Sequence, residues 1–175
     1  MRWIVLLFVL ALSSSATAAP QAKAVPPEVR KHLAALNAEC RGYGGQPGNS
    51  PGLIKVGDLT GDSAVDYVID LNGYNCDGAA SALAAGQSGA GVAVFASGPG
   101  GAATKVYENT VYAAAIDTKG PKPRLYLDLG GMECGQKNAA KIPFSNWKFC
   151  SRPVDWNPAK RTFDLAPLAQ ARMIQ

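Results

Sequence analysis

The chain has 175 residues, with 17 Lys and Arg against 13 Asp and Glu, which gives a formal net charge of +4. The charges are scattered, and the densest basic segment is only Lys119, Lys122 and Arg124 in a proline-containing turn. Because no basic stripe with interleaved aromatic residues is present, we expect no nucleic-acid binding. No segment after the N-terminus offers the roughly twenty consecutive apolar residues of a membrane span, so we expect no membrane-spanning helix in the mature protein.

Residues 1–18 have the features of a secretory signal peptide. A basic start at Arg2 is followed by about ten apolar residues and then by a region of small residues, with a favourable cleavage point after Ala18. The apolar stretch is too short for a permanent anchor, and the alternative is a buried N-terminal helix. The segment therefore predicts export to the periplasm or secretion.

Cleavage after Ala18 leaves 175 − 18 = 157 residues, the size of one ordinary domain. We expect a disordered lead over residues 19–25 and a single domain over residues 26–170, present as a monomer. An amphipathic helix of about 14 residues is expected to start at Pro26-Pro27 and to stop near Arg41, because prolines are tolerated in a first turn. Its apolar face is formed by Val29, Leu33, Leu36 and Cys40.

The rest of the chain alternates short apolar or β-branched segments with turns rich in Gly, Pro and Asn, which is typical of antiparallel strands. These segments are residues 53–57, 66–71, 91–96, 104–116, 124–129, 147–151 and 161–165. In residues 66–71, Tyr67 and Ile69 alternate with Asp66 and Asp70, which predicts a half-buried strand. The predicted fold class is α+β and mostly antiparallel, with one N-terminal helix packed on a sheet of about 5–7 short strands.

Four cysteines, Cys40, Cys76, Cys134 and Cys150, lie in the part of the chain that we expect to be exported. An even number of cysteines in an oxidising compartment predicts two disulfides, and four cysteines allow three connectivities. We favour Cys40–Cys76, which would tie the helix to the sheet, and Cys134–Cys150, which would close a local loop. The alternative is a metal site or a redox pair, but no C-x-x-C pair is present and the one histidine, His32, is distant in sequence.

The segment from Asp58 to Asp66 has the spacing of a calcium loop. Calcium prefers about six to eight oxygen ligands, and acids at odd positions around a glycine turn can point inward together. The expected ligands are the side chains of Asp58, Thr60, Asp62 and Asp66, the carbonyl of Ala64 and a water molecule. The loop is not an EF-hand, because Gly61 lies at position 4 and Ile69 stands where an EF-hand has its bidentate Glu. The alternative is a tight Asx-type turn, in which Asp58 and Asp62 accept backbone N–H groups without a metal.

At these residues the segment resembles the Asp-x-Asn-Gly-Asp-Gly-x-x-Asp motif of FG-GAP and VCBS repeats, which are strand–loop–strand units. The resemblance implies a structural calcium loop between two strands. The chain departs from the motif at Thr60, a weaker ligand than Asn or Asp, and at Ser63, where the lost glycine stiffens the turn. A wider likeness, from the Cys40 helix through the Asp-rich loop to Cys150, is to a group of small uncharacterised proteins exported by proteobacteria. It implies the same architecture and no particular activity.

We expect the protein to be a binding or structural module with a protein or cell-envelope partner, and not an enzyme. Ser88, the best nucleophile candidate, is not followed by a helix pattern, and the only histidine precedes it. Two alternatives stay open: a small extracytoplasmic hydrolase that uses carboxylates, and a protein inhibitor or adhesion-type domain without metal. The carboxylates available to a hydrolase are Asp70, Asp77, Glu108, Asp117, Asp128 and Glu133.

Aromatic residues at strand spacing offer a recognition surface in principle, but such residues usually belong to the core. We therefore expect these aromatic side chains to lie in the core: Tyr107, Tyr112, Tyr126, Trp147, Phe149 and Trp156.

Overall fold

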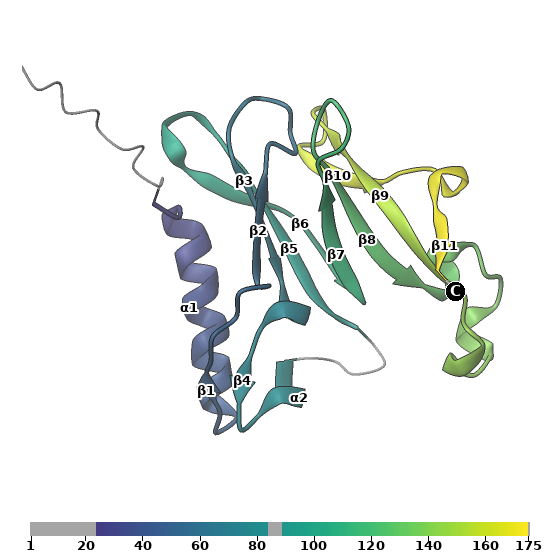
Figure 1. Cartoon of the computed structure of the whole chain (residues 1–175), viewed down its shortest axis with the longest axis horizontal. Helices are drawn as coiled ribbons and strands as arrows, with labels where there is room; N and C mark the ends of the chain where they lie inside the picture. The colour runs from purple at the N-terminus through teal and green to yellow at the C-terminus, as the bar shows by residue number, and fades with distance from the viewer. Residues whose placement is uncertain (1–23, 84–88, 175) are drawn as a thin grey trace, which may run out of the picture.

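Figure 1 shows the computed structural model, which describes residues 24–83 and 89–174. The signal peptide predicted at residues 1–18, the disordered lead up to residue 23, and Ser88 lie outside the described residues. In the part that is described, no helix is both long and apolar enough to cross a membrane.

The predicted N-terminal helix is confirmed as α1 (Pro27–Gly42). Pro27 occupies its first position, where the missing N–H costs no intrahelical hydrogen bond. Val29, Leu36 and Cys40 are buried, as the apolar spacing predicts, and Leu33 is half-buried. A second, short helix is α2 (Ala80–Leu83).

The strands form two main antiparallel sheets and one two-stranded ribbon. The first sheet has the order β2-β3-β5-β6, with β2 (Ile54–Gly57), β3 (Asp66–Asp70), β5 (Ala90–Ser97) and β6 (Ala103–Val111). The second has the order β10-β9-β8-β7, with β7 (Ala113–Asp117), β8 (Arg124–Gly130), β9 (Phe149–Asn157) and β10 (Thr162–Leu165), and β11 (Arg172–Ile174) also pairs with β9. The ribbon pairs β1 (Gln46–Pro47) with β4 (Cys76–Asp77). Short 3-10 turns are η1 (Leu71–Gly73), η3 (Pro99–Gly101), η4 (Gly131–Cys134), η5 (Ala139–Lys141), η6 (Phe144–Asn146) and η7 (Leu168–Gln170).

The predicted class, α+β and mostly antiparallel, is confirmed, but the strands divide between two main sheets where we expected one. The division arises inside the predicted segment 104–116, which is interrupted at Tyr112. The Tyr112 backbone N–H donates to the Asp128 carbonyl of β8 at 2.8 Å, so the chain leaves the first sheet there and enters the second. A long β-branched segment therefore becomes two strands, β6 and β7.

The elements form three layers, with α1 against the outer face of the first sheet and the second sheet on its other side (Figure 1). Tyr67 and Ile69 of β3 pack with Val29 of α1, while Val68 packs in the core between the sheets. Every residue of β3 is buried, so the prediction of a half-buried strand is wrong. The two faces were assigned correctly, but both are covered, because β3 is a central strand between two layers.

Both favoured disulfides are confirmed. Cys40–Cys76 ties α1 to β4, and Cys134–Cys150 ties η4 to β9. The linked residues are 36 and 16 positions apart, and loops of these lengths stabilise a fold by roughly 3–4 kcal/mol each in the chain-entropy description.

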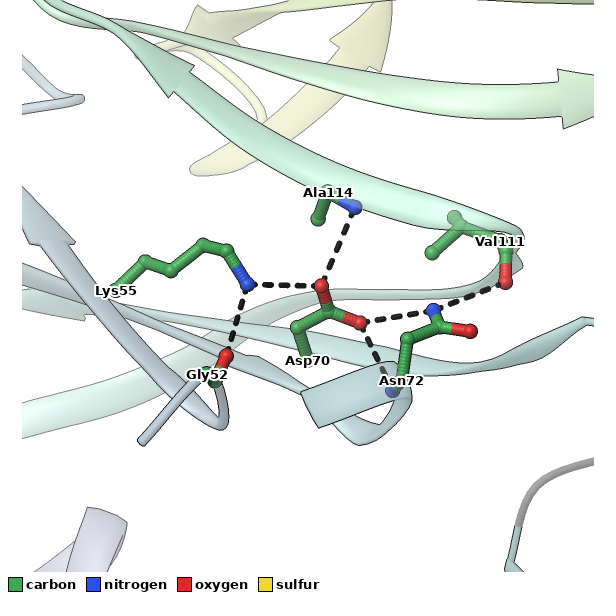
Figure 2. A network of polar contacts seen from close by, with 6 residues as sticks. All are labelled: Gly52, Lys55, Asp70, Asn72, Val111 and Ala114. Atoms are coloured by element: carbon green, nitrogen blue, oxygen red, sulfur yellow. Dashed lines mark hydrogen bonds and ion pairs between the residues drawn. The ribbon is translucent and has the colours of Figure 1, made fainter. Parts of the chain in front are cut away.

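A buried carboxylate, Asp70, joins the two sheets near the point where the chain crosses between them (Figure 2). Asp70 is 3% exposed, and its Oδ2 accepts from Lys55 Nζ at 2.9 Å and from the Ala114 N–H at 3.2 Å. Its Oδ1 accepts hydrogen bonds from the backbone N–H and the side-chain Nδ2 of Asn72, at 3.1 and 2.9 Å. Asn72 Nδ2 also donates to the Val111 carbonyl. Both Asp70 oxygens are thus engaged in structural contacts, which gives no support to Asp70 as a hydrolytic residue.

Candidate binding site at the loop end

Four hairpin connections gather at one end of the two sheets, which we call the loop end (Figure 1). They join β2 to β3, β5 to β6, β7 to β8 and β9 to β10, and they span residues 58–65, 98–102, 118–123 and 158–161. The antiparallel pairings place all four at the same end, with Gly57 opposite Asp66 and Asp117 opposite Arg124. The opposite end carries the turns η4 to η6.

The Asp66 carboxylate fixes the first of these loops to the sheet. Its side chain is 0% exposed, and its Oδ2 accepts the N–H groups of Leu59 and Thr60 at 2.8 and 2.9 Å. Its Oδ1 accepts the N–H of Ser97, at the end of β5, at 2.9 Å. Burial raises the pKa of the Asp66 carboxyl above its ordinary value, and the three N–H donors oppose that rise because they stabilise the charged form.

The exposed part of the loop wraps around Asp58. Asp58 Oδ1 accepts the N–H groups of Gly61 and Asp62 at 2.7 and 3.1 Å, and its Oδ2 accepts that of Ser63 at 3.0 Å. Asp62 Oδ1 accepts the N–H of Ala64 at 2.8 Å. These are the contacts that the Asx-type turn predicts. Gly61 and Ser63 both have positive φ, at 80° and 69°, so Ser63 occupies a conformation that favours glycine.

The five expected calcium ligands lie on one loop, and the carboxylates of Asp58, Asp62 and Asp66 accept backbone N–H groups there. Among the described residues, no three His, Cys, Asp or Glu side chains form a group that could hold a metal ion. Thr60 Oγ1 is buried and has no partner at hydrogen-bond geometry. The Thr60 side chain nevertheless lies close enough to the Asp66 carboxylate to lower its pKa. A Cβ on Gly61 would lie 3.0 Å from Lys122 Nζ, so an ammonium group lies beside the loop. Calcium binding stays a prediction.

Two hollows flank the loop and share Thr60 and Trp156 in their walls. The first, of about 420 Å³, lies between the 58–61 segment and the second sheet. The second, of about 380 Å³, lies between the same loop and the start of β6. Both volumes fall in the range of ligand pockets, about 300–1,000 Å³. We call the two together the loop-end groove.

Trp156, at the end of β9, packs against the core as expected, and it also borders this groove. Its ring packs on Phe163 of β10 with centroids 5.2 Å apart, which leaves it half-buried. The six aromatic side chains that we expected in the core are each only half-buried, so that expectation is met in part. The sequence did contain a signal: Trp156 comes directly before Asn157-Pro158, and a residue beside a turn lies at the end of a sheet rather than at its centre.

The charged residues of the groove are unevenly paired. Arg124 binds Asp155 with two parallel hydrogen bonds of 2.9 Å, and it also reaches Gln170. By contrast, Lys122 and Arg161 are exposed and have no ion pair or hydrogen bond within the described part of the chain. Arg161 also has a φ of 53°, which is unusual for a residue with a side chain.

No family model, curated protein or solved structure matches this chain. The likeness to FG-GAP and VCBS loops therefore remains a resemblance over one segment.

Proposed function

We propose that this protein is an extracytoplasmic binding module that recognises a partner at its loop end. The observation that carries the proposal is a loop whose backbone donors are already satisfied by its own carboxylates, next to two open hollows. A surface that keeps its shape before binding loses less conformational entropy when the partner arrives, and this raises affinity. The two disulfides support a location outside the cytoplasm, because such bonds persist in oxidising surroundings.

A site-specific photo-crosslinking experiment tests the proposal. A benzophenone amino acid replaces the exposed Pro158 at the loop end or, as the matched control, the exposed Lys137 in the segment that follows η4 at the opposite end. The mature protein is then irradiated in the extracytoplasmic fraction of the source cells. We expect a discrete adduct from position 158 and none from position 137. An adduct from position 137 alone, or equal adducts from both, contradicts the proposal.

A structural calcium ion in the 58–66 loop is a second proposal, favoured by one observation. Thr60 Oγ1 is a buried hydroxyl beside the Asp66 carboxylate that lacks a partner at hydrogen-bond geometry, and a polar atom of this kind often marks an ion or a water. The melting temperature of the mature protein is compared in excess chelator and in millimolar calcium. Calcium at 100 times its dissociation constant adds about 2.7 kcal/mol to the free energy of unfolding, and an unchanged melting temperature contradicts the proposal.

A further inference from the structure

We propose that the loop-end groove takes an acidic peptide segment of the partner, in which carboxylates on both sides of an apolar residue pair with Lys122 and Arg161 while that residue packs on Trp156. The inference rests on the proposed function, because it names the chemistry of the partner at the same surface.

The loop-end groove contains more basic than acidic side chains. Its walls hold three cations, Lys122, Arg124 and Arg161, and two carboxylates, Asp62 and Asp155. Asp155 is neutralised by Arg124, whereas Asp62 keeps its negative charge because the Ala64 N–H that it accepts is neutral. The cations left without a partner in the described residues are Lys122 in the first hollow and Arg161 in the second. The first hollow therefore presents the positive charge of Lys122 to a ligand, and the second presents the unpaired Arg161 in a wall that also contains the Asp62 carboxylate.

Arg161 has an unusual backbone conformation in its turn. The turn between β9 and β10 is closed by the Lys160 N–H, which donates to Asn157 Oδ1, and Thr162 Oγ1 donates to the Val106 carbonyl on the neighbouring sheet. Arg161 follows in the left-handed region, where a residue with a Cβ costs roughly 1–2 kcal/mol more than glycine. A conformational outlier of this kind supports a functional hypothesis for its side chain. Here it places Arg161 in the wall of the second hollow.

Trp156 connects the two hollows of the groove, because it lines both of them. It is shared by both hollows, so a ligand that spans the groove crosses the indole ring. Tryptophan and arginine are the residue types that most often dominate protein–protein binding energy, and arginine pairs with carboxylates through two parallel hydrogen bonds. Two hollows that each contain a cation and that share Trp156 in their walls fit an extended peptide better than a compact small molecule.

Fluorescence of Trp156 tests the inference. The chain has three tryptophans, of which Trp3 lies in the predicted signal peptide, so Trp147→Phe leaves Trp156 as the only indole of the mature protein. The probe is the blocked pentapeptide Glu-Glu-Leu-Glu-Glu, and its neutral counterpart is Gln-Gln-Leu-Gln-Gln. We expect a saturable change in emission with the acidic probe and at least tenfold weaker binding of the neutral one. Calorimetry on the mature chain without the Trp147 change gives the same comparison if that variant does not fold.

Three variants locate the contact. Lys122→Ala and Arg161→Gly are each expected to weaken binding of the acidic probe about fivefold, close to the effect of one charge pair. Lys137→Ala, an exposed lysine at the other end, is expected to leave it unchanged. Arg161→Gly also relieves the positive φ, so it is expected to melt no lower than the parent chain, which separates lost binding from lost folding.

The inference is overturned if the acidic probe gives no saturable response up to millimolar concentration, if the neutral probe binds equally, or if Lys122→Ala and Arg161→Gly bind like the parent. Tighter binding of tetragalacturonate than of the peptide also overturns it, in favour of an acidic saccharide. If any of these results occurs while position 158 still crosslinks, the ligand class fails and the proposed function stands.

Discussion

Replacing Asp66 by alanine is expected to be the most damaging single change at the loop end. The substitution leaves three backbone N–H groups without an acceptor, and those of Leu59 and Ser97 are buried. At about 1–1.5 kcal/mol for each lost hydrogen bond, the sum is roughly 3–4.5 kcal/mol. Part of this is offset, because burial of the ionised carboxylate, which raises its pKa, is itself unfavourable. We expect a net loss of about 3 kcal/mol, or roughly 6–12 °C in melting temperature for a domain of this size.

Urea unfolding with the disulfides intact measures this loss, and two further variants interpret it. Asp66→Asn keeps the shape but offers one acceptor oxygen, so we expect a loss of about 1–3 kcal/mol. Since the folded-state pKa of Asp66 is raised, the folded state binds the proton more tightly than the unfolded state, and the parent should gain stability relative to Asp66→Asn as the pH falls. Asp58→Ala also removes the acceptor of three N–H groups, but these are exposed and can turn to water. If Asp66→Ala costs no more than Asp58→Ala, the reasoning is refuted.

Three further predictions concern single residues elsewhere. Ser63→Gly relieves the positive φ of 69° and should raise the free energy of unfolding by up to about 1 kcal/mol; a decrease contradicts the strain argument. The one histidine, His32, packs on Phe95 and lies near Lys105. Burial, and to a smaller extent the positive charge of Lys105, lower the pKa of His32, so an NMR titration should give a pKa below the ordinary value of about 6.5. Its contribution to stability should then be lost as the pH falls below about 6.5, and a measured pKa at or above that value contradicts the contact. Asp70→Ala should lower the free energy of unfolding by about 3 kcal/mol, because it removes the acceptor of the buried hydrogen bonds from Lys55 and Ala114. Lys55→Met should lower it by only about 1 kcal/mol, and equal losses contradict the arrangement in Figure 2.

Local features of the fold followed from the sequence because they depend on neighbours in the chain. The spacing of Val29, Leu36 and Cys40 fixed the buried face of α1, and the alternation around Ile69 assigned the two faces of β3 correctly. The sequence did not predict whether one or both faces of β3 are covered by another layer. The same alternating pattern suits a strand with one wet face and a central strand between a helix and a second sheet, and only tertiary packing distinguishes them.

In the candidate site, too, contacts between near neighbours in the chain could be predicted and contacts between distant residues could not. The turn around Asp58 follows from spacing, since its donors lie three to five positions along the chain. Asp66 also binds Ser97, which is 31 positions away, and Lys122 reaches Gly61 from another sheet. Contacts at such separations depend on the packing of the two sheets, so the groove had no signature in the sequence apart from the place of Trp156 beside a turn.

Amide hydrogen exchange of the mature protein in excess chelator tests the central claim most directly, namely that the loop end is held in shape by its own carboxylates. The account predicts that the N–H groups of Leu59 and Ser97 exchange slowly without calcium and become fast in Asp66→Ala. Rapid exchange of both in chelator, with protection only after calcium is added, would contradict it.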